Sequence, residues 1–203
     1  MSNNARQNPQ RLHPFRRFLA LALLVVMLPF LGLIYFEVIG FYKVPSSSME
    51  PTLFPNDFIF AVNASDYERG DIVVFHDPDN YDEFLVKRIV GVGGDTISVS
   101  GGAVFLNGRY ASEPYRHSPI DYLMEAFTVP DGELFLMGDH SNWSVDSHNW
   151  GEINDENGEV IKKGKPRSIP EDLVVGRVQQ IYLPKERWGP VSSYPLRAIG
   201  PKG

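Results

Sequence analysis

The sequence predicts a mainly β domain, with antiparallel strands in a sheet or barrel-like arrangement, preceded by a single membrane-spanning helix. Two observations predict this class: a long apolar run without charges at 18–36, and a series of short β-rich runs bounded by turn residues after residue 42. The chain has 203 residues and no cysteine. Its length fits one domain behind an anchor, and disulfides, thiolate metal sites and a cysteine nucleophile are excluded.

The predicted anchor is the run FLALALLVVMLPFLGLIYF at 18–36. As a helix it spans roughly 28 Å, about the thickness of a bilayer core. The positive charges that precede it are Arg6, Arg11, Arg16 and Arg17. By the positive-inside rule, these arginines place the N-terminus in the cytoplasm and the remaining chain across the membrane. A cleaved signal peptide is the alternative, but this run is longer than the apolar core of such a peptide, and no small-x-small site follows it before Pro45.

The predicted organisation is a cytoplasmic tail at 1–17, a transmembrane anchor at 18–40 and an extracytoplasmic β domain at 41–203, with a small second β region at about 96–137. The formal net charge is −6, and residues 1–40 carry four arginines against one glutamate, so the remaining chain is strongly acidic. An acidic domain argues against a nucleic-acid partner, which requires a basic face. The expected location is the inner (cytoplasmic) membrane, with the domain on the periplasmic or extracellular side.

The strands are predicted from runs rich in β-branched, aromatic and aliphatic residues. These runs are Phe58–Val62, Asp71–Phe75, Phe84–Val92, Thr96–Val99, Ala103–Leu106, Glu133–Met137 and Leu173–Leu183. Gly101 and Gly102 separate two of them and predict a hairpin. Residues 152–168 (EINDENGEVIKKGKPRS) are polar and have no apolar period, which predicts an exposed loop.

Three segments contain residue types that could carry chemistry, and each is ambiguous by itself. Lys87 lies inside the apolar run FLVKRIVGV: loss of hydration there would lower the pKa of its amine and make it a base, unless it points outward from an edge strand. Ser48 ends the triplet in VPSSSMEPTLFPND, which reads either as a linker or as a proline-braced nucleophile loop. The segment 138–151 (GDHSNWSVDSHNWG) has the composition of a tight, hydrogen-bonded turn.

Taken together and in order, these segments resemble type I signal peptidases, the membrane-bound serine endopeptidases that remove signal peptides from exported preproteins. The blocks that carry the resemblance are SSSMEPT (46–52), RGDIVVF (69–75), VKRIVGVGGD (86–95) and GD-x4-S-x-DS-x2-WG (138–151). They follow the apolar run at plausible spacing, and the resemblance extends over about residues 18–183. It implies a β catalytic domain of the signal peptidase type.

The resemblance also implies a Ser–Lys mechanism, a known alternative to the Ser-His-Asp triad. Ser48 matches the nucleophile and Lys87 the general base. Ser46 matches the hydroxyl that joins the Ser48 backbone N–H in the oxyanion hole, and Ser144 matches the serine that orients the lysine. No metal or cofactor is required. The implied partners are the signal peptides of exported preproteins and the lipid bilayer.

Further site residues are implied by the same match. The supporting positions are Arg88, Asp139 and Asp146. Two shallow apolar pockets would select small residues at the first and third positions before the cut, because an extended peptide presents alternate side chains to one wall. The expected walls of these pockets are Val44, Met49, Leu53, Leu85 and Val86.

The sequence departs from the family pattern at three positions. His140 stands where the family usually has Asn after Gly-Asp, and Leu85 replaces a common aromatic residue. His148 stands where an arginine commonly pairs with the aspartate that matches Asp146, so we expect that partnership to be weaker here or to depend on pH.

The sequence leaves three other interpretations of function open. A Ser-His enzyme would use one of four histidines of the domain, although no Gly-x-Ser-x-Gly elbow is present. Those histidines are His76, His117, His140 and His148. A related peptidase could be dedicated to a narrow substrate, such as a pilin. An anchored β domain could bind partners and cleave nothing.

Overall fold

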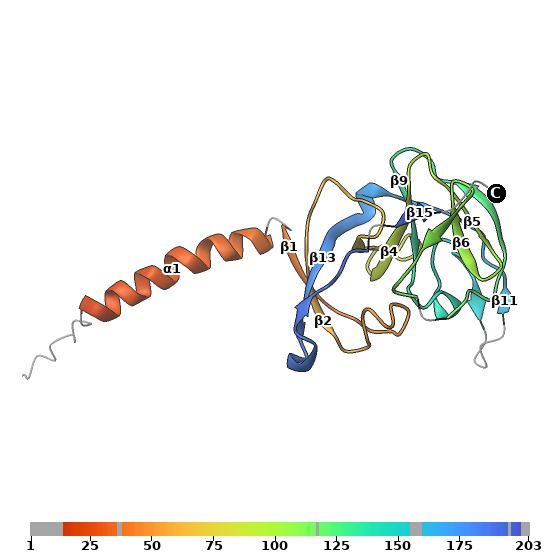
Figure 1. Cartoon of the computed structure of the whole chain (residues 1–203). Helices are drawn as coiled ribbons and strands as arrows, with labels where there is room; N and C mark the ends of the chain where they lie inside the picture. The colour runs from red at the N-terminus through yellow and green to blue at the C-terminus, as the bar shows by residue number, and fades with distance from the viewer. Residues whose placement is uncertain (1–13, 36–37, 117, 155–159, 195, 200–203) are drawn as a thin grey trace, which may run out of the picture. The chain divides into compact units, whose positions relative to one another are not determined.

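The computed structural model of the chain describes residues 14–35, 38–116, 118–154, 160–194 and 196–199. The chain divides into two compact units, Met1–Glu37 and Val38–Gly203 (Figure 1). The first unit contains one helix, and the described strands all belong to the second. The predicted class, a mainly antiparallel β protein with one N-terminal apolar helix, is therefore confirmed.

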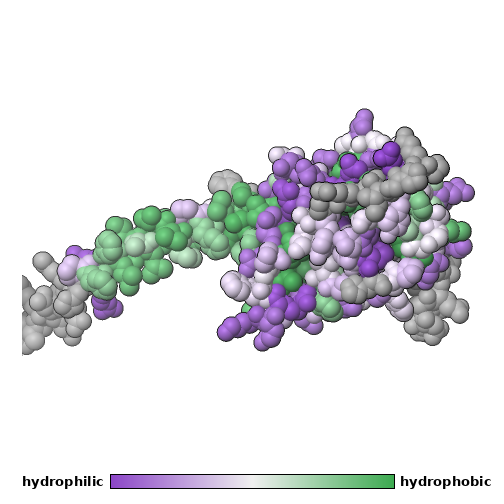
Figure 2. Space-filling view, in the orientation of Figure 1, coloured by the Kyte–Doolittle hydropathy of each residue, from purple (hydrophilic) through white to green (hydrophobic). Residues whose placement is uncertain are grey.

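Helix α1 (Pro14–Tyr35) is built from the predicted apolar run and is long and apolar enough to cross a membrane. Its leucines and alanines are strong helix formers, and none of its residues is buried (Figure 2). It begins before the predicted run because proline is favoured in the first turn, where its missing N–H has no partner. Pro29 lies inside the helix without ending it. Phe36, the last residue of the predicted run, lies outside the described residues.

Within the described part of the second unit, eight strands form the main sheet, and each neighbouring pair is antiparallel. Their order is β1 (Ile39–Lys43), β2 (Phe58–Val62), β13 (Val174–Leu183), β3 (Ile72–His76), β4 (Phe84–Val92), β9 (Glu133–Met137) and β12 (Ile169–Pro170), and β14 (Gly189–Pro190) also pairs with β13. The strand β4, which holds Lys87, therefore lies between β3 and β9 and is not an edge strand.

A second sheet of five described strands is formed mainly by the middle of the chain. Its order is β15 (Arg197–Ile199), β7 (Arg109–Ser112), β6 (Ala103–Leu106), β5 (Thr96–Ser100) and β8 (Met124–Thr128). The predicted hairpin joins β5 and β6, and both glycines of its turn have positive φ angles, 56° at Gly101 and 83° at Gly102. A residue with a Cβ atom would be strained in that conformation, which explains glycine at this turn.

The region 152–168 is more regular than the predicted loop. Strand β10 (Ile153–Asn154) pairs with β11 (Val160–Lys162), and a bridge joins Trp150 to Lys165. Trp150 is buried against Phe75, with ring centroids 6.3 Å apart, and so holds one end of the segment on the domain. Backbone pairing forms these strands without an apolar period, which is why sequence pattern alone missed them.

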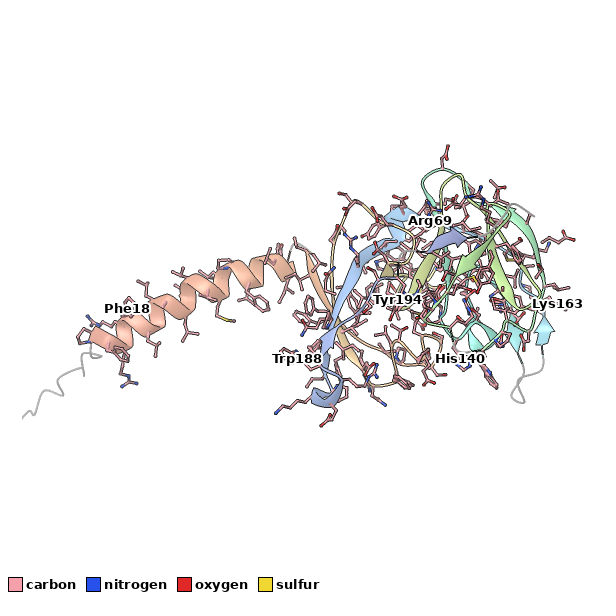
Figure 3. All side chains as sticks on the ribbon, in the orientation of Figure 1. Phe18, Arg69, His140, Lys163, Trp188 and Tyr194 are labelled. Atoms are coloured by element: carbon pink, nitrogen blue, oxygen red, sulfur yellow. The ribbon has the colours of Figure 1, made fainter. Side chains whose placement is uncertain are left out.

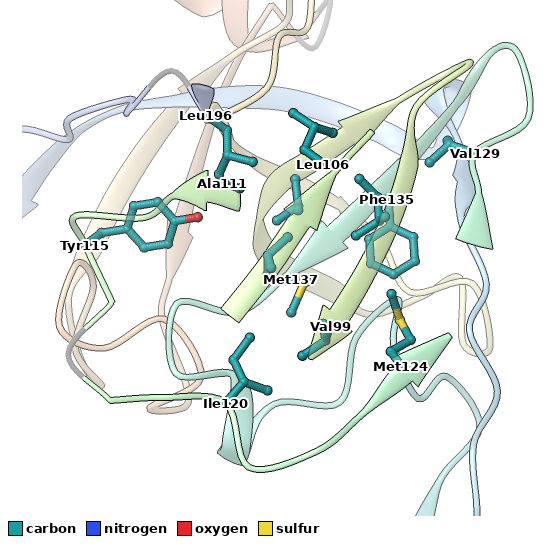
Figure 4. Packing of buried hydrophobic residues seen from close by; sticks show 13 residues of the cluster. Val99, Leu106, Ala111, Tyr115, Ile120, Met124, Val129, Phe135, Met137 and Leu196 are labelled. Carbon is teal, nitrogen blue, oxygen red and sulfur yellow. The ribbon is translucent and has the colours of Figure 1, made fainter. Parts of the chain in front are cut away.

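Three short 3₁₀ helices complete the described elements: η1 (Ser141–Trp143), η2 (Glu171–Leu173) and η3 (Lys185–Arg187). The buried apolar residues gather in three clusters. One fills the space beneath the second sheet and includes Val99, Leu106 and Met137 (Figure 4). A second packs Met49 and Leu53 against residues of β2, β3 and β13, so the turn that carries Ser48 is fixed by its own buried side chains.

Candidate active site

Lys87 is buried because β4 is a central strand. It pairs with Val73 of β3, the next residue pairs with Met137 of β9, and Lys87 is only 4% exposed. The alternative that this lysine points outward from an edge strand is wrong.

Ser48 lies in the turn that follows β1 and faces Lys87. The Lys87 Nζ atom donates a hydrogen bond of 2.8 Å to Ser48 Oγ, and this contact is buried. Met49 and Leu53 hold the turn from beneath, and the Leu53 N–H donates to the Met49 carbonyl at 2.9 Å. The hydroxyl and the amine, which are 39 residues apart in the sequence, are therefore brought together in a fixed geometry.

The environment of Lys87 favours the neutral amine. Burial lowers the pKa of Lys87, and the negative charges of Asp146, Asp139 and Asp77 oppose this effect without cancelling it. None of these carboxylates forms a described ion pair with Lys87, so no direct partner holds the proton on the amine. A neutral amine beside a hydroxyl can act as a general base.

Arg88 is fully buried and paired on several sides. Its Nε donates to Asp139 Oδ1 at 2.8 Å and its Nη2 to Asp139 Oδ2 at 2.7 Å, the two-pronged geometry that arginine makes with a carboxylate. Its Nη1 donates to the Gly70 carbonyl at 2.7 Å, and its guanidinium lies 4.0 Å from the centre of the Tyr115 ring. Thr52 Oγ1 also donates to Asp139. Sequence reasoning missed Thr52 and Tyr115, although Thr52 ends the SSSMEPT block.

Asp146 lies at the centre of a second buried network. It accepts the Gly138 backbone N–H at 2.8 Å, and its other oxygen lies 2.6 Å from His148 Nδ1. The His148 ring stacks on Tyr122, with ring centroids 4.0 Å apart and planes 5° apart. Burial alone would raise the pKa of Asp146, but the hydrogen bond and charge of His148, together with Lys87, bring the pKa below its ordinary value.

The two remaining serines differ in their contacts. Ser46 Oγ donates to Ser48 Oγ at 3.3 Å, so it lies beside the hydroxyl that the sequence identifies as the nucleophile. Ser144 Oγ is buried and has no hydrogen-bond partner among the described residues. The hydrogen bond from Ser144 to Lys87 that the family pattern implies is therefore not formed in this structure, and the orienting role of Ser144 stays a prediction.

A hollow of about 380 Å³ lies next to this site. It is lined by Val44, Leu85 and Val86 of the expected pocket walls, together with Phe84 and residues of β1, β2 and β3. Met49 and Leu53, also expected as walls, are fully buried and belong to the core, and neither lines this hollow. An apolar residue near a site can support its floor without facing a ligand, and the sequence does not separate the two roles.

No described hydrogen bond joins a histidine ring to the Ser48 hydroxyl, whose partners are Ser46 and Lys87. The His76 ring bonds the Tyr81 carbonyl and stacks on the Tyr81 ring, and the His148 ring faces Asp146. The His140 backbone N–H donates to the Ser48 carbonyl at 3.1 Å, and the buried Nδ1 of its ring has no hydrogen-bond partner among the described residues. His117 lies outside the described residues. Among the residues that the structure describes, no group of acidic, histidine or cysteine side chains is arranged to hold a metal ion.

A serine hydroxyl that is hydrogen-bonded to a buried lysine is the arrangement found in hydrolases that use an amine in place of histidine. The chain belongs to the signal peptidase family: the model described as "Signal peptidase, peptidase S26" matches residues 16–183. The match confirms the resemblance that the sequence motifs show to this family. The family is one of serine endopeptidases.

The chain is similar to curated members of this family. It is 33% identical over 191 residues to the probable signal peptidase I-1 of Synechocystis sp., covering 87% of this chain and 89% of the relative. It is 32% identical over 163 residues to the signal peptidase I of Leptolyngbya laminosa, covering 75% and 72%. A crystal structure of a signal peptidase I from Enterococcus faecalis V583 has a TM-score of 0.41 and 21% identity, covering 57% of this chain and 98% of that one.

Proposed function

We propose that this protein removes N-terminal signal peptides from exported preproteins, with Ser48 as nucleophile and Lys87 as general base. The observation that carries the assignment of residues is the buried hydrogen bond of 2.8 Å between Lys87 Nζ and Ser48 Oγ. Membership of the signal peptidase family supports the substrate class.

Acylation begins with the amine in its neutral form. Neutral Lys87 accepts the proton of the Ser48 hydroxyl as Ser48 Oγ attacks the scissile carbonyl carbon. Burial supports this step because it lowers the pKa of the amine. When the tetrahedral intermediate collapses, the protonated amine gives its proton to the leaving nitrogen, and the signal peptide remains as an ester on Ser48.

The negative oxygen of that intermediate needs hydrogen-bond donors. The Ser46 hydroxyl and the Ser48 backbone N–H are the proposed donors, and the position of Ser46 Oγ, 3.3 Å from Ser48 Oγ, supports this role. One such donor typically contributes about 3 kcal/mol to stabilising the transition state. In the second half of the reaction, neutral Lys87 takes a proton from a water molecule, which hydrolyses the ester and frees Ser48.

The hollow of about 380 Å³ is the proposed binding site for the residues before the cut. An extended peptide places every second side chain on the same wall, so Val44, Leu85 and Val86 would contact the first and third residues before the scissile bond. Leu85 and Val86 are half-buried, which leaves their exposed parts available for apolar contact with small side chains.

The supporting residues would keep these groups in place. The Arg88–Asp139 pair contacts Thr52 in the turn after Ser48, and thereby ties β4 to the segment 138–151 and to that turn. Asp146 holds the Gly138 N–H, and Gly138 lies against Ser48. Neither carboxylate is proposed to exchange a proton with substrate.

The membrane placement is also part of the proposal. The apolar helix would span the inner membrane, with residues 1–17 in the cytoplasm and the β domain from about residue 41 on the periplasmic or extracellular side. The arginines before the apolar run support this orientation. Protease added to spheroplasts should then digest the β domain without opening the cytoplasmic side, whereas digestion only after opening would contradict the orientation.

The neighbouring serines give a sharp test of the nucleophile. Ser48→Ala should abolish cleavage of a peptide with Ala at the first and third positions before the cut, because no hydroxyl is left to acylate. The matched control is Ser47→Ala, one residue away in the same turn, which should keep cleavage within about threefold because its hydroxyl has no proposed role. A mechanism-based acylating probe should label the parent and Ser47→Ala but not Ser48→Ala. Equal loss in both variants, with the fold intact, would refute the assignment.

A further inference from the structure

A second hollow, of about 640 Å³, has no part in the mechanism described above. Its walls come from the segment 121–123, from η1 and the residues that follow it, and from Lys163, which is labelled in Figure 3. None of these residues lines the hollow of about 380 Å³ beside Leu85 and Val86.

Ser144 connects the wall of this second hollow to the neighbourhood of the proposed catalytic pair. Ser144 is one of its lining residues. A Cβ atom added to Gly138 would lie less than 3.0 Å from both Ser144 Oγ and the Ser48 carbonyl oxygen, so both of these atoms lie against Gly138. The close approach requires glycine at this position. The second hollow therefore approaches Ser48 from the side of Ser144, whereas the hollow of about 380 Å³ is lined by Val44 and Val86.

Large apolar side chains are exposed around the second hollow. Leu123 is 81% exposed, Trp143 is 76% exposed and Val145 is 42% exposed, and all three line it. Exposed apolar side chains that gather beside a site, among polar residues, are typical of a surface that binds another molecule. The charged residues of the lining are Asp121, Glu152 and Lys163, so the wall has both signs of charge and no strongly basic or acidic face.

We propose that this second hollow binds the residues that follow the scissile bond, which form the start of the released mature chain. The proposal rests on the function proposed above. In an extended substrate the chain runs away from the scissile carbonyl in two opposite directions, at about 3.3 Å per residue. If the residues before the cut occupy the hollow beside Leu85, the second and third residues after it reach the surface around Trp143 and Val145. An apolar side chain there would be partly removed from water against the Trp143 ring.

The test uses the full chain in detergent and two quenched fluorescent peptides. Both have Ala at the first and third positions before the cut, and they differ only at the second residue after it, which is Leu in one and Ser in the other. The parent should cleave the Leu peptide with a kcat/KM about fivefold higher, the ratio expected when half of a leucine side chain leaves water. Trp143→Ala should bring this ratio close to one.

The matched control is Trp188→Ala, which removes a tryptophan that is 68% exposed and lies outside the second hollow. It should keep the ratio of the parent. An unchanged ratio in Trp143→Ala, or an equal fall in Trp188→Ala, would overturn the proposal. A ratio that varies with enzyme concentration would also overturn it, because the hollow would then be covered by a second copy of the chain.

A second measurement does not depend on any variant. A peptide that contains only residues after the cut, with Leu at its second position, should compete with the Leu substrate at lower concentration than its Ser counterpart, and equal inhibition would contradict the proposal. Loss of cleavage of both peptides in Ser48→Ala tests the proposed function separately, since that result does not depend on the Leu-to-Ser ratio.

Discussion

Lys87 and Arg88 are neighbours on β4, but they lie on opposite faces of the strand and differ in whether a carboxylate pairs with them. Arg88 is fully buried but meets a carboxylate with two hydrogen bonds, a backbone carbonyl and an aromatic ring. Lys87 is almost as deeply buried, yet its described hydrogen bond goes to a serine hydroxyl. Successive side chains of a strand point to opposite faces, so one short segment provides both environments.

The difference shows which chemistry each cation can perform. A guanidinium is not deprotonated in proteins, so a buried arginine needs a paired carboxylate and hydrogen-bond acceptors for its N–H groups. An amine can avoid the cost of burial by losing its proton, and the pKa of Lys87 is lowered by burial for this reason. The face on which Arg88 is completely paired would support the site, and the face on which Lys87 has no described ion pair would supply the proposed base.

The largest expected effect comes from making Lys87 resemble its neighbour. Lys87→Arg introduces a group that does not deprotonate, so it should lower kcat/KM by at least about 10³-fold, and Lys87→Met should have an equal effect. Turnover of the two variants and the parent on the Leu peptide is the measurement. Circular dichroism and thermal melting establish that each variant is folded. Turnover near the parental rate in folded Lys87→Arg would exclude the Ser–Lys mechanism.

The pH dependence of the parent follows from the same amine. Since only the neutral form accepts a proton, kcat/KM should rise about tenfold per pH unit below the pKa of Lys87 and level off above it. Burial places that pKa below the ordinary lysine value, so the plateau should begin at lower pH than for an exposed amine. A profile that falls with rising pH over this range would contradict a lysine base.

The second effect is on stability and concerns the other face of β4. Arg88→Met leaves the Asp139 carboxylate buried without its main partner, which should lower the free energy of unfolding by about 3–5 kcal/mol. Adding Asp139→Asn to Arg88→Met removes the unpaired charge and should recover part of the loss. Chemical denaturation of the two single variants and the double variant gives the coupling energy. Additive losses would mean that the pair is not a unit.

In the same denaturation experiment, Lys87→Met should raise the free energy of unfolding, whereas Arg88→Met lowers it. The folded-state pKa of Lys87 is lowered, so the unfolded chain binds this proton more readily and the buried amine destabilises the fold at neutral pH. The variant should gain about 1 kcal/mol or more at pH 7, and the gain should disappear as the pH rises towards about 10.4, the value of a free lysine. We therefore expect Lys87→Met to be inactive but more stable, because the buried amine that catalysis requires destabilises the fold.

The contrast between β4 and the region 152–168 shows what the sequence could predict about the fold. Dense β-branched and aliphatic runs predicted β2, β4, β6 and β9 with the bounds that the structure has. Strands β7, β10 and β11 are at most 4 residues long, too short to give a local pattern, and form because a partner strand accepts their backbone hydrogen bonds. That information lies in the tertiary structure and not in a local pattern.

In the candidate active site, too, some residues could be predicted from local motifs and others are placed only by the tertiary structure. The motifs identified Ser48 and Lys87, and the structure brings them within hydrogen-bonding distance. Tyr115 is far from every motif and comes to lie on Arg88 only through folding. Met49 and Leu53 have the composition expected of a pocket wall but face the core, because an apolar side chain fits either environment.

The smallest expected effect concerns His148, which stands where the family commonly has arginine. Its ring pairs with Asp146 at 2.6 Å, and the charge of Asp146 raises the pKa of Lys87 against the larger effect of burial. His148→Gln removes the possibility of a positive charge beside Asp146, so the pKa of Lys87 should rise and the acidic limb of the pH–rate profile should move to higher pH. His148→Arg fixes a positive charge there and should move the limb to lower pH.

The shift should be at most about one pH unit, which corresponds to a change in rate of about tenfold on the acidic limb and almost none on the plateau. The matched control is His76→Gln, since the His76 ring bonds Tyr81 and has no described contact with Asp146 or Ser48. Its profile should match that of the parent. An acidic limb that moves in opposite directions in His148→Gln and His148→Arg indicates an electrostatic role for His148. Loss of packing against Tyr122 alone would lower the plateau of kcat/KM in both variants and leave the limb at the same pH. If His76→Gln or His148→Gln proved as damaging as Ser48→Ala in a folded protein, a histidine and not Lys87 would be the base.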